Sequence, residues 1–403
     1  MTEVADTEVA SFPMTRTCPF SPPAEYRTMR EEAPVSQVEL PTGQRAWVVT
    51  RLDDVRTMLT DPRLSSDRRN PNFPMIVPGQ RRRPDFKASL ITMDAPEHGQ
   101  ARREVVGEFT VRRMKALQPR IQEIVDERID AMLAGPPGAD LVRALSLPVP
   151  SLVICELLGV PYRDHDFFQA RTAKLLNRHT PADERGEAFD ELLDYLDQLV
   201  TGKEKAPTED DLLGRQVLRQ RAQDAEDHDG LVSLAFLLLV AGHETTANMI
   251  SLGTLALLEN PDQLAIIKND PSRTLDAVEE LLRYFTIAET ATSRVAVEDI
   301  EIGGVLVKAG EGVITLGNAA NRDPAAFEAP DTLDFERGAR HHVAFGFGAH
   351  QCLGQNLARM ELQIVFDTLF ARIPGLRLAA KVADLPFKDD ATIYGLHELP
   401  VTW

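Results

Sequence analysis

The ten residues that decide the fold read FGFGAHQCLG, from Phe345 to Gly354. Glycines at positions 346, 348 and 354 flank Cys352 and let the backbone pass close to a flat object, because glycine has no Cβ to hold it away. A helix is predicted over 353–372, and the N–H groups and dipole at its N-terminus would stabilise a thiolate at Cys352. With Phe345 as an aromatic shield, such a thiolate suits a strongly donating axial metal ligand.

The same stretch has a plainer interpretation, a glycine-rich turn that contains an incidental buried cysteine. It also begins like a dinucleotide-binding fingerprint, because Gly346 and Gly348 have that spacing. The third glycine of that fingerprint is absent, since residue 351 is Gln, and no β-α-β unit is predicted after it. The ligand and turn interpretations therefore both stay open at this point.

The composition excludes several classes of protein. The 403 residues include 44 basic and 62 acidic ones, a net charge of −18. This charge disfavours general nucleic-acid binding, because phosphates need clustered Lys and Arg. The longest apolar run, 231–242, is about twelve residues, short of the ~20 that span a bilayer. The N-terminus lacks the basic and apolar regions of a signal peptide, so we expect a cytoplasmic protein without a membrane anchor.

Three cysteines are too few for a disulfide framework, and no CxxC pair suggests a zinc site. Cys155 lies in the apolar run LVICELLGV and is predicted to be a small buried hydrophobic residue. Cys18 lies in a terminal proline-rich stretch and is expected to be incidental.

The chain is predicted to fold as one domain, 1–403, that is mainly α with small β-sheets (α+β). Residues up to about 20 are expected to be irregular, and the six prolines of 62–96 predict a long, lid-like ordered loop. The pattern is helical over 97–285. A β-hairpin with a Gly-Gly turn is predicted over 300–307. No linker separates these parts.

A second motif, Ala241-Gly242-His243-Glu244-Thr245-Thr246, interrupts the apolar helix predicted over 231–258. Ala241 and Thr245 share one face, and Gly242 removes bulk where something approaches the backbone. A buried Glu244 beside the Thr245 hydroxyl can pass protons. A polar cluster that faces another helix is the alternative, whereas an HExxH zinc site is excluded because residue 247 is Ala.

The stretch FGFGAHQCLG resembles the haem-binding signature of the cytochrome P-450 superfamily, with Phe, two Gly, a basic residue, Cys and Gly at these spacings. Three further motifs in the family's order extend the resemblance over most of the chain: the Thr245 helix, Glu280-x-x-Arg283, and Asp334–Arg337. The resemblance implies the P-450 fold, with haem b between the central distal helix and the proximal cysteine-loop helix. Cys352 would then be the proximal thiolate, bound to the iron.

The resemblance also implies residue roles. Thr245 would hold and protonate oxygen at the haem, Glu244 would relay protons from solvent, and His243 would point away. Glu280, Arg283 and Arg337 would form an ionic network that supports the fold and the haem loop. Four residues match positions that clamp the haem propionates in similar bacterial proteins: His98, Arg102, Arg294 and His350. The remaining haem-contacting positions are Ala241, Gly242, Phe345, Gly346 and Gly354.

The resemblance implies a monooxygenase that uses O2 and receives electrons from a ferredoxin and its reductase, and so indirectly from NAD(P)H. The basic segment Arg112-Arg113-Lys115 is a candidate docking face for an acidic ferredoxin, or else a solvated helix face. A haem-binding sensor or carrier without turnover is the alternative of another class. The Thr245 and Glu244 pair argues against it, because a carrier needs no proton relay.

The whole sequence looks most like actinobacterial members of the superfamily, most of which are monomers. Those enzymes tailor macrolides, polyenes among them, or hydroxylate sterol-like and xenobiotic molecules. We therefore expect a lipophilic substrate, with a polyene or other macrolide preferred over a sterol-like or xenobiotic one. The residues predicted to line the pocket are apolar: Phe86, Leu90, Leu238, Ile287, Ala288 and Ile393.

Overall fold

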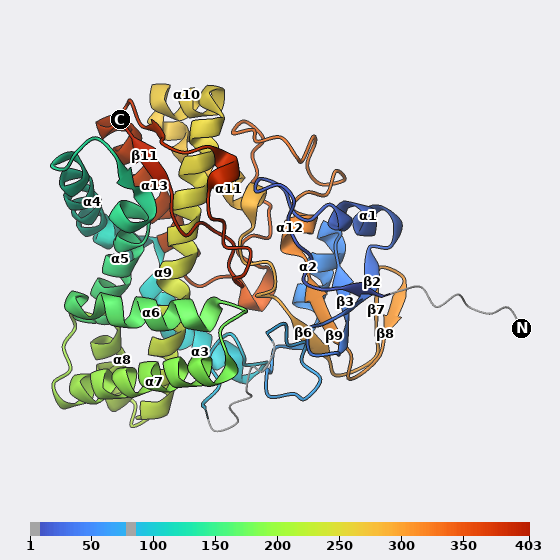
Figure 1. Cartoon of the computed structure of the whole chain (residues 1–403). Coiled ribbons are helices and arrows are strands. Elements are labelled where there is room, and N and C mark those ends of the chain that lie inside the picture. Colours follow the sequence, from blue (N-terminus) through green and yellow to red (C-terminus); the bar gives the residue numbers. More distant parts are fainter. Residues whose placement is uncertain (1–8, 78–85) are drawn as a thin grey trace, which may run out of the picture.

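A computed structural model describes residues 9–77 and 86–403. Parts of two predicted segments, the irregular N-terminus and the lid-like loop, therefore lie outside the described residues. Helices make up most of the molecule, on the left of Figure 1, and the sheets gather mainly on the right. The prediction of a mainly α protein with small sheets is confirmed.

The helices carry the core. They are α1 (Glu25–Glu32), α2 (Leu52–Thr60), α3 (Glu97–Val105), α4 (Val111–Leu133), α5 (Pro148–Leu158), α6 (His165–Leu176), α7 (Ala182–Lys205), α8 (Leu212–Ala222), α9 (His228–Glu259), α10 (Pro261–Asn269), α11 (Thr274–Phe285), α12 (Gly317–Ala320) and α13 (Gln355–Arg372). The helix predicted to start at 353 thus begins two residues later, because Gly354 is its N-cap.

Helix α9 runs through the centre of the helical part (Figure 1) and packs against α5, α7 and α13. It is long and apolar enough to cross a membrane by length and composition, although its longest run of apolar residues looked too short for that. Its side chains are nevertheless mostly buried inside the protein. A helix that is apolar nearly all round lies inside a large core, and α9 does so here.

In the described residues, three sheets flank the helices. The largest has the order β1 (Ala10–Ser11), β2 (Val35–Glu39), β3 (Arg45–Val49), β9 (Gly312–Thr315), β6 (Arg294–Ala296) and β4 (Leu64–Ser65). The second has the order β10 (Arg377–Leu378), β11 (Pro400–Thr402) and β5 (Ala139–Asp140). The third is the predicted hairpin, β7 (Ile300–Ile302) and β8 (Val305–Val307), whose turn glycines both have positive φ.

The N-terminal segment is more ordered than expected. Strand β1 pairs parallel with β2, and the Phe12 N–H donates to the Glu39 carbonyl at 2.8 Å. Buried Phe12 anchors this strand in a small hydrophobic cluster beneath the sheet. Strand β1 has two residues, too few for a period-2 pattern to be visible in the sequence.

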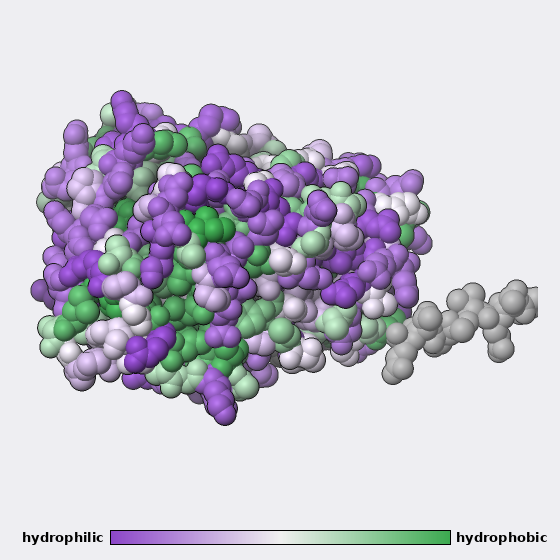
Figure 2. Space-filling model, turned by 90° about the horizontal axis from the view of Figure 1, so that it is seen from above, coloured by the Kyte–Doolittle hydropathy of each residue, from purple (hydrophilic) through white to green (hydrophobic). Residues whose placement is uncertain are grey.

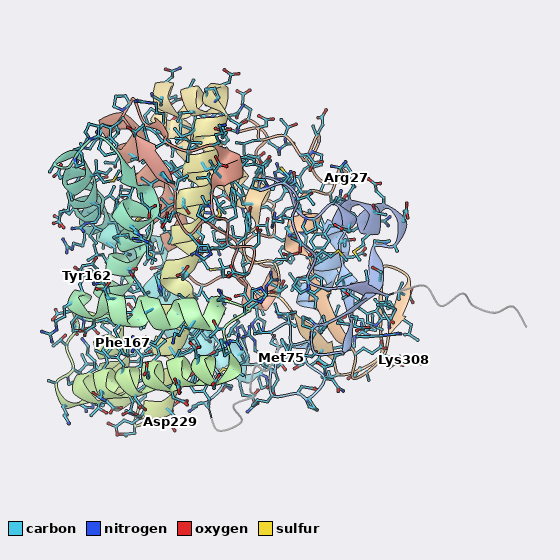
Figure 3. The ribbon with its side chains drawn as sticks, in the orientation of Figure 1. Arg27, Met75, Tyr162, Phe167, Asp229 and Lys308 are labelled. Atoms are coloured by element: carbon cyan, nitrogen blue, oxygen red, sulfur yellow. The ribbon has the colours of Figure 1, made fainter. Side chains whose placement is uncertain are left out.

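Hydrophilic side chains cover most of the face shown in Figure 2, and apolar ones gather in small areas over the helical part. This distribution fits the net charge of −18. Met75 lies where the chain passes between the helical part and the large sheet, as Figure 3 shows. A cavity also lies at this junction, since Met75 is one of the residues that line it.

Candidate active site

A hydrogen bond within the cysteine loop and two glycines with positive φ fix the conformation of the loop. The Cys352 N–H donates to the Phe345 carbonyl at 2.8 Å, and Gly346 and Gly348 both have a φ of 70°, the left-handed region that glycine adopts without strain. Burial raises the pKa of the Cys352 thiol, whereas the N–H groups of Gly354 and Gln355 lower it. The donors expected at the helix N-terminus therefore reach the sulfur, although α13 starts two residues later than predicted.

Four groups that carry positive charge or donate hydrogen bonds gather beside this loop: His98, Arg102, Arg294 and His350. The rings of His98 and His350 stack at 4.0 Å, and Arg102 Nη2 donates to the Gln351 carbonyl at 2.6 Å. Burial and the charges of Arg294, His98 and Arg102 lower the pKa of His350 to about 3. Burial lowers the pKa of Arg294 to about 10.

This cluster suits the anionic edge of a haem. Burial and the charges of Arg102 and Arg294 lower the pKa of both His98 and His350, which is the behaviour of a cationic site that lacks its counter-charge. Asp94 is the carboxylate that opposes this repulsion at His98 and Arg294, but its oxygens already accept from Ser65 Oγ and the Ser66 N–H. Among the described residues, His98 Nε2 is buried without a hydrogen-bond partner. The residues present therefore fit two propionates, with Cys352 as the thiolate ligand.

The acid–alcohol pair lies on α9 at the edge of the cavity. Thr245 Oγ1 donates to the Ala241 carbonyl at 2.9 Å, one turn earlier, and both residues line the cavity. The carboxylate of Glu244 is buried and lines it too. Glu244 Oε2 accepts from Asn248 Nδ2 and from Lys388 Nζ, each at 3.2 Å. Sequence reasoning missed Lys388, which follows α13 in an irregular segment and carries no local motif.

Gly242 lies at the contact between α9 and α5. A Cβ at this position would lie 2.7 Å from Ile154 Cδ1, so the missing side chain makes room for α5, and the contact of Gly242 with a cofactor stays a prediction. His243, the next residue, points away from the cavity, as expected. Its Nδ1 donates to the Leu239 carbonyl at 2.7 Å, and its ring meets the edge of Phe168 at 5.4 Å.

The structure brings Glu280, Arg283 and Arg337 into one buried network. Arg283 Nε and Nη2 donate to the two oxygens of Glu280, both at 2.7 Å, and Arg337 Nε donates to Glu280 Oε1 at 3.1 Å. Arg283 Nη1 also donates to the carbonyls of Asn321 and Pro330. Arg283 is fully buried, so these bonds fix the chain that leads to the cysteine loop.

The neighbouring residue Glu279 forms a second network, which sequence reasoning missed. Its oxygens accept from Arg359 of α13, and His342 Nε2 lies 3.1 Å away. Arg359 Cζ in turn lies 4.7 Å from the ring centroid of Phe345 in the cysteine loop. Burial opposes ionisation of Glu279, but hydrogen bonds from His342 and Arg359 outweigh it and lower its pKa to about 2. Two adjacent acidic residues, 279 and 280, were the feature of the sequence that could have indicated this second network.

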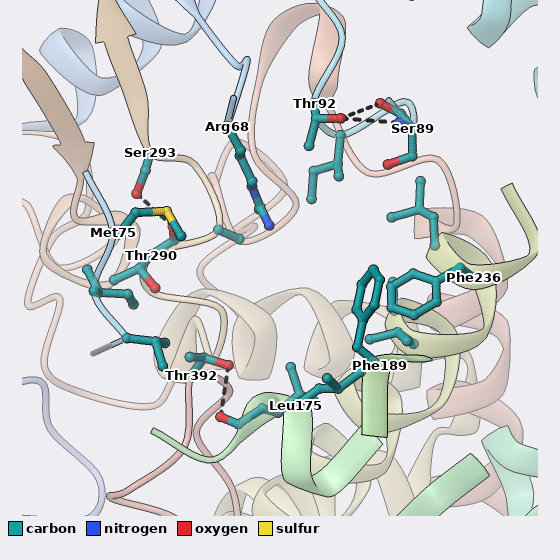
Figure 4. A pocket seen from close by; sticks show the side chains of 18 of the residues that line it. Arg68, Met75, Ser89, Thr92, Leu175, Phe189, Phe236, Thr290, Ser293 and Thr392 are labelled. Carbon is teal, nitrogen blue, oxygen red and sulfur yellow. Dashed lines mark hydrogen bonds between the residues drawn. The ribbon is translucent and has the colours of Figure 1, made fainter. Parts of the chain in front are cut away.

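A cavity of about 460 Å³ borders the Thr245 face of α9. Figure 4 shows it between Phe189 and Phe236 on one side and Met75, Thr290 and Ser293 on the other. Of the six residues predicted to line it, Phe86, Ala288 and Ile393 do so.

The other three pocket predictions are wrong. Leu238 is one residue out of phase with the face of Leu237, Ala241 and Thr245, and it packs in the main hydrophobic cluster. Leu90 and Ile287 are buried in the same cluster. Hydrophobicity alone did not separate core from cavity wall, because both are apolar.

Among the described residues, no three side chains of His, Cys, Asp or Glu meet at a candidate metal site. Cys155 is buried within α5, and burial raises the pKa of its thiol to about 12, so it remains a neutral core residue. Cys18 is exposed. An iron held by Cys352 would therefore need its other ligands from the porphyrin that the resemblance implies.

The chain is similar to known proteins over nearly its whole length. The family model described as cytochrome P450 matches residues 273–373. Pentalenic acid synthase of Streptomyces avermitilis is 52% identical, over 98% of this chain and 97% of that protein. The crystal structure of cytochrome P450 MoxA from Nonomuraea recticatena has 59% identity and a TM-score of 0.89, over 98% of each chain. That of CYP105P1 in complex with filipin I has 43% identity and a TM-score of 0.90, over 98% of this chain and 99% of that one.

Both the resemblance and the fold predicted from the four motifs are confirmed by these similarities, which extend over nearly the whole chain. Relatives of this kind are named as synthases, hydroxylases and monooxygenases. The chain belongs to the cytochrome P450 family of haem monooxygenases.

Proposed function

We propose that the protein hydroxylates a lipophilic natural product, and that macrolides, polyenes among them, are its substrate class. The observation that carries the proposal is the mainly apolar cavity of about 460 Å³ against the Thr245 face of α9. A concave apolar site with a few polar groups suits a small lipophilic molecule. The similarity to CYP105P1, solved in complex with filipin I, supports the macrolide class.

The residues of the site would have different roles in this reaction. Bound haem would supply the oxygen chemistry that inserts a hydroxyl group at an unactivated carbon. Cys352, His98, Arg102, Arg294 and His350 would hold it. The N–H donors at Gly354 and Gln355 favour the thiolate form of Cys352. The cavity side chains would exclude water and fix which carbon faces the reacting centre.

Protons would reach the cavity through Glu244 and Thr245. Glu244 is held by Lys388 and Asn248, so it must leave at least one of these partners to carry a proton. The Thr245 hydroxyl points back to the Ala241 carbonyl, and it can turn to donate into the cavity that it borders. The pair would then move protons between solvent and the cavity.

Electrons would come from a ferredoxin and its reductase, and so indirectly from NAD(P)H. The exposed segment Arg112-Arg113-Lys115 begins α4, next to the cysteine loop. Asn356 Nδ2 of α13 donates to the Phe109 carbonyl, just before α4, at 3.3 Å and links the starts of the two helices. A basic face at the start of α4, on the cysteine-loop side, suits an acidic ferredoxin. We further propose a cytoplasmic monomer.

An optical titration of the purified ferric protein tests the substrate class. The panel holds a polyene macrolide, a non-polyene macrolide, a secosteroid and a flat aromatic. We expect a saturable low-to-high-spin Soret shift with a macrolide, and hydroxylated product when a ferredoxin, its reductase and NADPH are added. A shift with the secosteroid or the aromatic alone would instead identify the sterol-like or xenobiotic alternative.

Thr245→Ala separates the enzyme from a haem-binding sensor or carrier. In a monooxygenase, this variant should lose product and release peroxide, because the relay is broken. A carrier would bind ligands equally well with either residue and form no product.

A further inference from the structure

Arg68 is a charged side chain that points into the cavity. It follows β4 in the chain, and Figure 4 shows it extending into the space between Ser293 and Thr290 on one side and Phe189 and Phe236 on the other. Its guanidinium borders the cavity, and the surrounding protein is close enough that burial lowers its pKa. The position is therefore one where an unbalanced charge is costly.

The backbone holds Arg68 in this direction. Asp67 and Asn70 form a turn, with a hydrogen bond of 3.1 Å from the Asn70 N–H to the Asp67 carbonyl. The Ser66 N–H donates to Asp94 Oδ1 at 2.7 Å and fixes the start of the turn. Arg69, the next residue, also borders the cavity, but it pairs with Asp67 at 2.9 Å. Of these two adjacent arginines, only Arg69 therefore has a carboxylate partner among the described residues.

Arg68 lacks a partner in the described part of the chain. No carboxylate there affects its pKa, and no acceptor lies within hydrogen-bond distance. Its nearest ring, Phe73, is 5.9 Å from Cζ. The carboxylate that lines the cavity, Glu244, is already held by Lys388 and Asn248.

We propose that Arg68 binds a carboxylate on the substrate, so that the substrate is a lipophilic monocarboxylic acid. This inference rests on the proposed hydroxylation of a lipophilic natural product and narrows the substrate to molecules of that kind, macrolides among them, that carry one carboxylate. A guanidinium presents a planar fork that matches a carboxylate bidentately. Two more arginines line the cavity, but Arg69 is paired with Asp67 and Arg185 donates to backbone carbonyls. The guanidinium of Arg68 balances one negative charge, so a carboxylate fits better than a phosphate group, which carries nearly two. The apolar walls then receive the rest of the molecule, which the carboxylate orients over the Thr245 face.

A matched set of ligands tests the proposal on the haem-loaded protein. Dodecanoic acid, dodecan-1-ol and methyl dodecanoate are titrated at pH 7.4, by the Soret shift or by displacement of 4-phenylimidazole. We expect the wild type to prefer the acid by about 10- to 100-fold, the range of a charge-assisted hydrogen-bond pair. Arg68→Gln should abolish the preference, and Arg68→Lys should keep part of it. Arg63→Gln, the matched control, should leave the preference unchanged, because Arg63 is paired with Asp61 and does not line the cavity.

Two results would overturn the proposal. One is a wild type that binds acid and alcohol equally, or an Arg68→Gln variant that keeps the preference. The other is an Arg68→Gln or Arg68→Lys variant that loses haem, because Arg68 would then serve the cofactor. Haem content and circular dichroism of every variant separate these cases from misfolding. Failure of the monooxygenase proposal looks different: no product forms from any substrate, whatever the preference for acids.

Discussion

The charged residues that support the cysteine loop are paired with one another, whereas Arg68 in the cavity wall has no charged partner among the described residues. In the support, Glu280 is bonded to Arg283 and Arg337, and Glu279 to Arg359, so each buried carboxylate meets a cation within the protein. In the cavity wall, Arg68 meets no acceptor among the described residues. A closed network, in which the charges are paired, stabilises the fold, whereas an unpaired charge can bind a ligand of opposite charge. The first region should therefore respond to mutation in stability and the second in binding.

Opening the closed network gives the largest expected effect. Arg283→Ala leaves the Glu280 carboxylate buried with one cation fewer and frees the carbonyls of Asn321 and Pro330. Removing one partner of a buried ion pair costs about 3 to 5 kcal/mol. We expect this loss in the free energy of unfolding, measured by urea denaturation, together with a lower haem content.

The matched control is Arg120→Ala, which breaks exposed pairs with Glu123 and Glu156. Its cost should be about 0 to 1 kcal/mol. Equal costs for the two variants would contradict the division into a stabilising and a ligand-binding region.

Acid should weaken the second network. The pKa of Glu279 is about 2 in the folded protein against an ordinary value of 4.5, so ionised Glu279 stabilises the fold above about pH 4.5. That stabilisation is lost as the pH falls from about 4.5 toward 2, because the unfolded chain binds the proton first. A shift of this size corresponds to about 3 kcal/mol.

The measurement is urea denaturation of the wild type and of Glu279→Gln at several pH values between 3 and 7. The wild type should lose more stability than the variant between pH 5 and 3. Parallel curves would show that Glu279 is not strongly coupled to Arg359 and His342.

The two regions also differ in how far the sequence predicts them. The cysteine loop, the Glu280 network and the four propionate positions lie in short motifs whose residue types and spacing carry the chemistry. Lys388 contacts Glu244 and Arg68 borders the cavity, but each residue lies in a segment with no motif. The direction of each side chain depends on turns that long-range packing fixes. Leu237 faces the cavity and Leu238 faces the core, because neighbouring residues point to different faces of a helix. Which face of α9 borders the cavity is known only when the elements packed against α9 are known.

A substitution of Lys388 tests whether a charged residue near the cavity affects the rate of product formation rather than the stability of the fold. Lys388→Met should slow product formation about three- to tenfold, because Glu244 loses a charged hydrogen-bond partner that positions it. In a Glu244→Gln background the same change should have no further effect on product formation. Additive effects of the two substitutions on the rate of product formation would mean that Lys388 acts elsewhere.

The smallest effect is expected at Gly242. An alanine Cβ there would meet Ile154 Cδ1 at 2.7 Å, a contact that the end of this side chain can relieve by turning. Alanine also favours the helix over glycine by up to about 1 kcal/mol, which offsets the clash. We expect Gly242→Ala to change the free energy of unfolding by less than about 1 kcal/mol, with normal haem content and ligand affinity. Adding Ile154→Val should recover whatever stability is lost, because the shorter side chain makes room for the Cβ. A large loss of haem in the single variant would instead show that the helix backbone must approach the cofactor at this residue, and would extend the cofactor site into the α5–α9 contact.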